Sequence, residues 1–109
     1  MVQAIENRTD LEGIVAGRAP DPDREAYELL DVDVEQAASV EGYADLLSSR
    51  AGGRVAVSVR RELLPDGSLD GARVRLRARL AGPGVVMADS DPKAVSVRPP
   101  GSPPSSLEL

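Results

Sequence analysis

The chain has 109 residues, no cysteine, no histidine, two aromatic residues and a formal net charge of −5. The absence of cysteine excludes disulfides and thiolate sites, and the absence of histidine removes imidazole bases and the histidine-based catalytic triads. The negative charge disfavours general binding to nucleic acid or to anionic membranes. We therefore expect no enzyme, no cofactor and no metal site.

The first predicted strand covers residues 11–18 and contains two glycines, Gly13 and Gly17. Glycine inside a strand indicates a β-bulge or a close approach of another backbone. Residues 19–24 contain two prolines and two aspartates, which predict a turn. The chain is therefore expected to open with an irregular strand that ends at this turn.

Residues 26–38 alternate apolar and acidic side chains, which predicts a half-buried strand. The apolar residues of the inner face are Leu30, Val32 and Val34, and the acidic residues of the outer face are Asp31, Asp33 and Glu35. In residues 39–50 the apolar spacing changes to three and four, with Ser39 available as a cap. This change predicts one short helix.

Two further strands are predicted at residues 54–60 and 72–80, on either side of a Pro-Asp-Gly turn. Such a turn favours a chain reversal, so we expect the two strands to pair as an antiparallel hairpin. Short strands are predicted at residues 85–88 and 94–98. We expect a single β-rich domain in residues 1–98 and a disordered Pro/Ser-rich tail in residues 99–109.

Five to six short strands, frequent turns and one short helix predict a mainly β fold, a small antiparallel barrel or sheet. The glycine-bulged opening strand, the long second strand and the Gly-Pro-Gly turn before a short closing strand resemble the oligonucleotide/oligosaccharide-binding (OB) fold. The resemblance spans residues 11–90 and implies a small closed barrel. It also implies a helix between the third and fourth strands, whereas the helical pattern here precedes the third strand.

Arginines recur with a period of two on one predicted strand and are joined by two more on the strand expected beside it. These candidate binding residues are Arg54, Arg60, Arg73, Arg75, Arg77 and Arg79. A row of guanidinium groups can hold phosphates or carboxylates. The alternative is that Asp31, Asp33 and Glu35 lie across from the arginines and pair with them in a surface ladder of mixed charge.

We interpret the chain as a non-enzymatic interaction domain that binds another protein or self-associates. The alternative is a single-stranded nucleic-acid-binding OB module that uses the arginine face. Such modules also stack bases on aromatic rings, and the two arginine-bearing strands contain none, which disfavours nucleic acid. With no signal-peptide pattern and no apolar run long enough to span a bilayer, we expect a cytoplasmic protein without a membrane partner.

Overall fold

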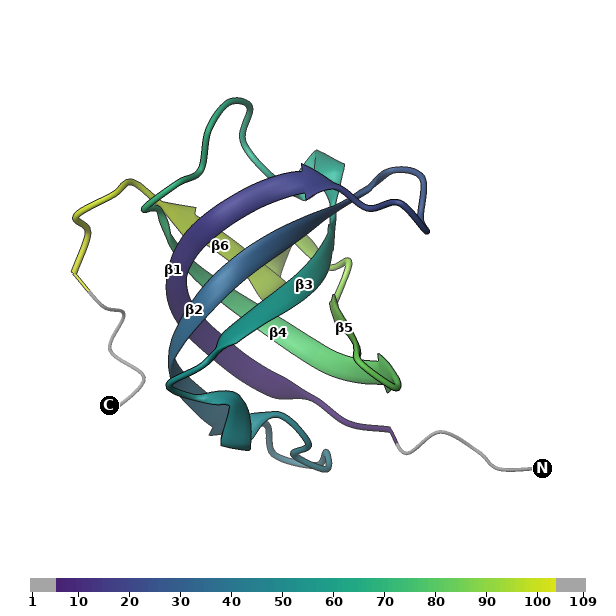
Figure 1. The fold of residues 1–109 in the computed structure, drawn as a ribbon. Coiled ribbons are helices and arrows are strands. Elements are labelled where there is room, and N and C mark those ends of the chain that lie inside the picture. Colours follow the sequence, from purple (N-terminus) through teal and green to yellow (C-terminus); the bar gives the residue numbers. More distant parts are fainter. Residues whose placement is uncertain (1–5, 104–109) are drawn as a thin grey trace.

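The computed structural model describes residues 6–103, and these residues form six β-strands and three short 3-10 turns (Figure 1). The strands are β1 (Thr9–Pro20), β2 (Tyr27–Ser39), β3 (Arg54–Arg60), β4 (Arg73–Gly82), β5 (Val85–Ala88) and β6 (Val95–Arg98). The 3-10 turns are η1 (Ser48–Arg50), η2 (Arg61–Leu63) and η3 (Pro92–Ala94). The predicted mainly β class is confirmed. Within residues 6–103, no helix has the length and apolarity needed to cross a bilayer.

Five of the strands close into a barrel. Their order is β1-β2-β3-β5-β4, and β1 also pairs with β4, which completes the ring. The sixth strand, β6, pairs with the first half of β4, while β5 pairs with its second half (Figure 1). Strands β3 and β5 run parallel, with Val57 opposite Val86, so the barrel is mixed and not purely antiparallel.

Both glycines of the opening strand lie at the predicted irregularities. The register between β1 and β2 shifts between Glu12 and Gly13 and again between Val15 and Gly17. A Cβ atom at Gly13 would lie 2.1 Å from the carbonyl oxygen of Asp33, a distance at which atoms overlap. The two backbones can approach this closely only because position 13 has no side chain.

The inside of the barrel is filled by aliphatic side chains. The buried core consists of Leu11, Val15, Leu30, Val32, Val34, Leu47, Val55, Val57, Val59, Leu64, Leu69, Ala72, Val74, Leu76, Ala78, Val86 and Ala88. The alternating valines and leucines predicted to face inward in residues 26–38, 54–60 and 72–80 are among them, except Leu80, which is partly buried and packs against this core. The residues between them therefore point outward, and most of them form the surface of the barrel, whereas Ser58 and Arg73 are covered by other parts of the chain.

The predicted hairpin of residues 54–60 and 72–80 is wrong, because β5 lies between β3 and β4. Residues 61–72 do contain the expected turn, with Gly67 at a φ of +91°. However, this connection is longer than the two to about five residues that close a hairpin. It crosses one end of the barrel, buries Leu64 and Leu69, and is held by hydrogen bonds from Arg18 Nη1 to two of its carbonyls.

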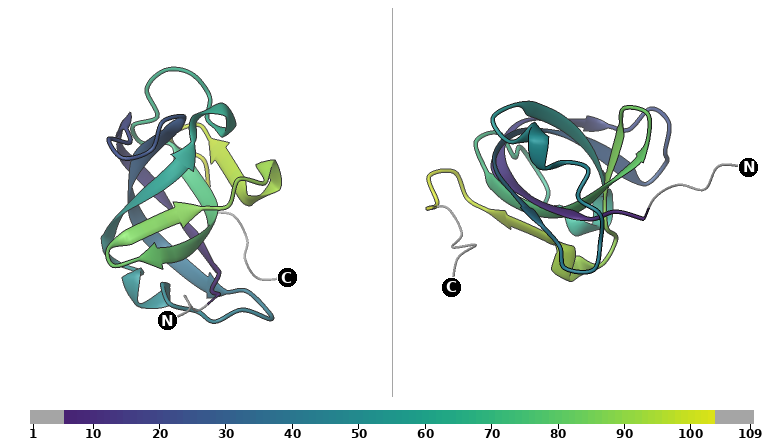
Figure 2. Two further views of the ribbon diagram at one scale, coloured as in Figure 1. Left: turned by 90° about the vertical axis from the view of Figure 1, so that its right-hand side faces the viewer. Right: turned by 90° about the horizontal axis from the view of Figure 1, so that it is seen from below.

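The helix predicted in residues 39–50 is also absent, apart from η1. Strand β2 continues to Ser39, and Gly42 then turns the chain with a φ of +88°. The Asp45 carboxylate accepts hydrogen bonds from the backbone N–H groups of Leu47 and Ser48, at 3.2 and 3.0 Å. These bonds fix a loop across the other end of the barrel (Figure 2), in which Leu47 joins the core. The helical spacing of apolar residues thus belongs to a loop that covers the barrel.

The predicted tail begins with an ordered turn. The N–H and hydroxyl groups of Ser102 donate to the carbonyl oxygen of Pro99, at 3.2 and 2.7 Å. The Ser102 carbonyl in turn accepts from Arg73 Nε at 3.1 Å, which holds the turn against β4. The remainder of the predicted tail, residues 104–109, lies outside the described residues.

Candidate functional site

The outer surface of β4, called the β4 face below, carries Arg75, Arg77 and Arg79. The pleat turns these side chains outward because the intervening residues fill the core. Asp10 and Arg8 border the β4 face on the side of β1, since Asp10 lies opposite Arg77 in the β1–β4 register. On the other side, the chain between β5 and β6 makes an excursion away from the sheet.

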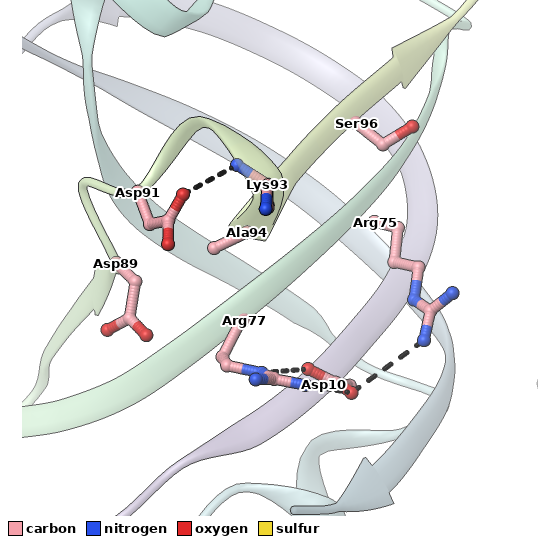
Figure 3. Close-up of a pocket in the computed structure, with 8 residues that line it drawn as sticks. All are labelled: Asp10, Arg75, Arg77, Asp89, Asp91, Lys93, Ala94 and Ser96. Atoms are coloured by element: carbon pink, nitrogen blue, oxygen red, sulfur yellow. Dashed lines mark hydrogen bonds and ion pairs between the residues drawn. The ribbon is translucent and has the colours of Figure 1, made fainter.

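This excursion, residues 89–94, brings the single lysine to the β4 face. The Asp91 carboxylate accepts a hydrogen bond from the backbone N–H of Lys93 at 2.9 Å, and Pro92 occupies the first position of η3. An Asp followed by Pro is a favourable start for such a turn. Figure 3 shows Lys93 on η3, above the strand that bears Arg75 and Arg77.

A hollow of about 420 Å³ lies between the excursion and β4 (Figure 3). It is lined by Asp10, Arg75, Arg77, Asp89, Asp91, Lys93, Ala94 and Ser96. Figure 3 shows the two excursion carboxylates at one end of this hollow and the two arginines toward the other. Lys93 lies between the two groups.

Asp10 is the carboxylate closest to the arginines of this hollow. Arg77 donates two hydrogen bonds to it, from Nε at 2.9 Å and from Nη2 at 3.3 Å. Arg75 approaches the same carboxylate more loosely, with Nη2 at 3.8 Å from Oδ2. The hydrogen bond and the charge of Asp10 raise the pKa of the Arg77 guanidinium above its ordinary value. One carboxylate thus forms ion pairs with two guanidinium groups.

A second hollow, of about 310 Å³, shares Asp89 and Asp91 with the first. It is lined by Arg8, Tyr27, Arg79, Met87, Ala88, Asp89, Ser90 and Asp91. Together the two hollows contain five cationic side chains and three carboxylates. Arg8 pairs with Asp89 at 3.2 Å, whereas Arg79 and Lys93 make no ion pair within residues 6–103. The β4 face therefore has an excess of positive charge on a chain whose net charge is −5.

The outer surface of β2, called the β2 face below, is acidic. It carries Asp31, Asp33 and Glu35. Arg54 donates to Asp33 at 2.8 Å, and this hydrogen bond holds the pKa of the Asp33 carboxyl below its ordinary value. Both side chains are more than half exposed, so the pair contributes little to stability.

The six predicted arginines do not gather in one place. Arg75, Arg77 and Arg79 share the β4 face, whereas Arg54 and Arg60 lie on β3, which does not neighbour β4. Arg73 begins β4 and is buried. Arg60 pairs with Glu62 at 2.9 Å and lies over the Tyr27 ring, 5.8 Å from its centroid.

The predicted pairing with acidic residues occurs in part. Asp33 pairs with Arg54, and Glu35 pairs with Arg73 at 2.6 Å. For Asp31 no ion pair is found among residues 6–103.

Three residues of the β4 face were not identified from the sequence: Arg8, Asp10 and Lys93. Asp10 precedes the predicted strand, and its place beside Arg77 depends on the register between β1 and β4, which no local pattern reveals. The Asp-Pro pair before Lys93 indicates a turn, but not the strand that the turn approaches.

The β4 face is suited to binding oxyanions and not to proton transfer. Guanidinium groups stay protonated and present several N–H donors in a fixed plane. No cluster of three or more Asp, Glu, His or Cys residues that could hold a metal ion is found in residues 6–103.

Comparison with models of protein families, with curated proteins and with solved structures finds no match to this chain. Only its own residues therefore indicate what the chain binds.

Proposed function

We propose that the chain is an OB-type barrel that acts as a non-enzymatic interaction module. A small Greek-key barrel of five strands is the architecture of that fold, and the ring β1-β2-β3-β5-β4 agrees with it. The connection between the third and fourth strands carries η2 where an OB fold usually has a helix. That difference is confined to one end of the barrel.

The module binds an anionic segment of a partner protein on the β4 face. The observation that carries this proposal is the excess of cations over carboxylates there, including Arg79 and Lys93, which have no ion pair within the described chain. Exposed surface cations of this kind attract anionic partners and speed their association. The two hollows also provide concave surface, which a flat ladder of ion pairs lacks.

Single-stranded nucleic acid is the weaker candidate for two reasons. OB modules use the face of their second and third strands for nucleic acid, and here the carboxylates of β2 offset the arginines of β3 on that face. Such binding also relies on successive stacking rings, and Tyr27 is the one aromatic residue that lines the two hollows of the β4 face. A polypeptide needs no stacking surface.

The test is fluorescence anisotropy with a labelled peptide that contains both acidic and phosphorylated residues, a neutral peptide and a single-stranded oligonucleotide. We expect the anionic peptide alone to bind, and more weakly at physiological than at low salt, because the contacts are between exposed charges. The Arg75→Glu/Arg77→Glu variant should weaken binding by at least about tenfold.

The matched control is Arg50→Glu/Arg54→Glu, which reverses two exposed arginines that line neither hollow and should leave the affinity unchanged. Tighter binding of the oligonucleotide would favour the nucleic-acid alternative. No binding of any probe at low salt would contradict the proposal. A mass in solution that falls with added salt would instead identify a second copy of the chain as the partner.

A further inference from the structure

Three cationic side chains approach the first hollow of the β4 face from two different elements. Arg75 and Arg77 come from β4, and Lys93 comes from η3. The Ser96 side chain lies on the same wall as Arg75 (Figure 3). A ligand group in this hollow is therefore offered two guanidinium groups, one ammonium and one hydroxyl.

A carboxylate of the chain already occupies part of this arrangement. Asp10 takes the Nε–Nη2 edge of Arg77 and lies 3.8 Å from Arg75. Its side chain is only 13% exposed, which indicates that it is held in place and not freely moving in solvent. The donors that remain for a ligand are the Nη1 group of Arg77, the Arg75 guanidinium, the Lys93 ammonium and the Ser96 hydroxyl.

For a ligand carboxylate this arrangement is unfavourable. If it displaces Asp10, one carboxylate replaces another and little free energy is gained. If it binds beside Asp10, it must rely on single N–H contacts, because Asp10 already occupies the two-donor edge of Arg77 that a carboxylate prefers. A phosphodiester of nucleic acid also carries a single charge per phosphate.

A phosphate monoester has different properties. Near neutral pH it carries a charge of about −1.5 to −2 and three strong acceptor oxygens. Its three oxygens can accept from more than one of the donors that line the hollow, while Asp10 keeps the Nε–Nη2 edge of Arg77. At the arginine end of the hollow, the cations Arg75, Arg77 and Lys93 outnumber the one carboxylate there, and the attraction of this end for an anion grows in proportion to the charge of the ligand.

We infer that this hollow is a phosphomonoester site for a phosphorylated segment of the partner protein, and that Asp10 determines its specificity by excluding carboxylates. The inference rests on the proposed function and names the chemistry that the β4 face recognises. The carboxylates at the other end of the hollow, Asp89 and Asp91, disfavour a second anion beside the phosphate. They match a basic residue next to the phosphorylated one.

The test compares three peptides of one sequence, with phosphoserine, glutamate or serine at one position and lysine beside it. Isothermal titration on the full chain should give at least about tenfold tighter binding of the phosphoserine peptide than of the glutamate peptide. The affinity of the chain for the phosphoserine peptide should fall as the pH drops below about 6, where the phosphate takes up a proton. The affinity of the glutamate peptide should not change in this range.

Two variants separate the role of Asp10 from general attraction between charges. Asp10→Asn should strengthen binding of the glutamate peptide and bring the two affinities to within about threefold of each other. Lys93→Ala, at an exposed position outside the core, should weaken binding of the phosphoserine peptide more than binding of the glutamate peptide. Arg54→Ala is the matched control and should change neither affinity.

Equal affinities of the wild-type chain for the phosphoserine and glutamate peptides would overturn the inference and leave the proposed function standing. An unchanged preference in Asp10→Asn would overturn the role of Asp10. Binding of neither peptide at low salt would overturn the inference and the proposed function together.

Discussion

The β4 face and the β2 face carry opposite charges on one barrel, and they differ in how those charges are paired. Beside the β2 face, Arg54 has its own carboxylate, Asp33. On the β4 face, Arg75 and Arg77 share Asp10, and Arg79 has no ion pair within residues 6–103. An arginine-rich strand therefore indicates a binding surface only where the neighbouring strands supply too few carboxylates.

Strand β1 separates the two faces, because it lies between β2 and β4 in the ring. The pairing of β1 with β2 can be disrupted at Gly13, where a Cβ atom would lie 2.1 Å from the Asp33 carbonyl oxygen. We expect Gly13→Ala to lower the free energy of unfolding by about 3 kcal/mol, since two strand backbones must move apart. Urea unfolding followed by circular dichroism measures this change.

Gly17→Ala is the matched control on the same strand. Its Cβ would lie 3.4 Å from a carboxylate oxygen of the Asp31 side chain, which can rotate away. We expect it to cost less than about 1 kcal/mol. Equal stabilities of the two variants would show that the close approach at Gly13 does not hold β1 and β2 in register.

Acid should remove the ion pairs on the barrel surface, because it neutralises the carboxylates and leaves the arginines charged. The hydrogen bond from Arg54 lowers the pKa of Asp33 below 3.8, and the hydrogen bond from Arg18 lowers the pKa of Glu28 below 4.5. The unfolded chain therefore takes up protons first as the pH falls. The stability that these pairs contribute is present above the ordinary pKa values and is lost as the pH falls through the lowered folded-state values.

The measurement is the urea midpoint at a series of pH values between neutral and strongly acidic. We expect a constant midpoint in the neutral range and a fall below about pH 4.5. Asp33→Asn/Glu28→Gln should show a smaller fall than the wild-type chain. A wild-type midpoint that stays constant into strong acid would contradict the assigned pairs.

Local pattern predicted much of the fold because each strand has one buried face. The alternation of valines in residues 54–60 gave the bounds of β3 residue for residue, and Gly13 indicated the bulge in β1. Local pattern could not predict which strands pair with each other. The separation of β3 from β4 by β5 depends on the long connection of residues 61–72, whose buried leucines cover the barrel and do not form a hairpin.

The candidate site was also predicted only in part, because strand periodicity is local whereas the pairing of strands is not. Period two placed the β4 arginines on one outer face, as the structure has them. That period could not identify Asp10 as the carboxylate shared by two of them, because the register of β1 against β4 joins residues far apart in sequence. Nor could it place Lys93, which reaches β4 through the excursion between β5 and β6.

The most direct test of binding at the β4 face is a two-dimensional ¹H–¹⁵N NMR titration of the chain with the phosphoserine peptide. We predict that the amide signals of Arg75, Arg77, Lys93 and Ser96 shift with added peptide, while those of Asp33 and Arg54 stay in place. Shifts confined to β2 and β3 would contradict the proposed site, because they would place binding away from the β4 face.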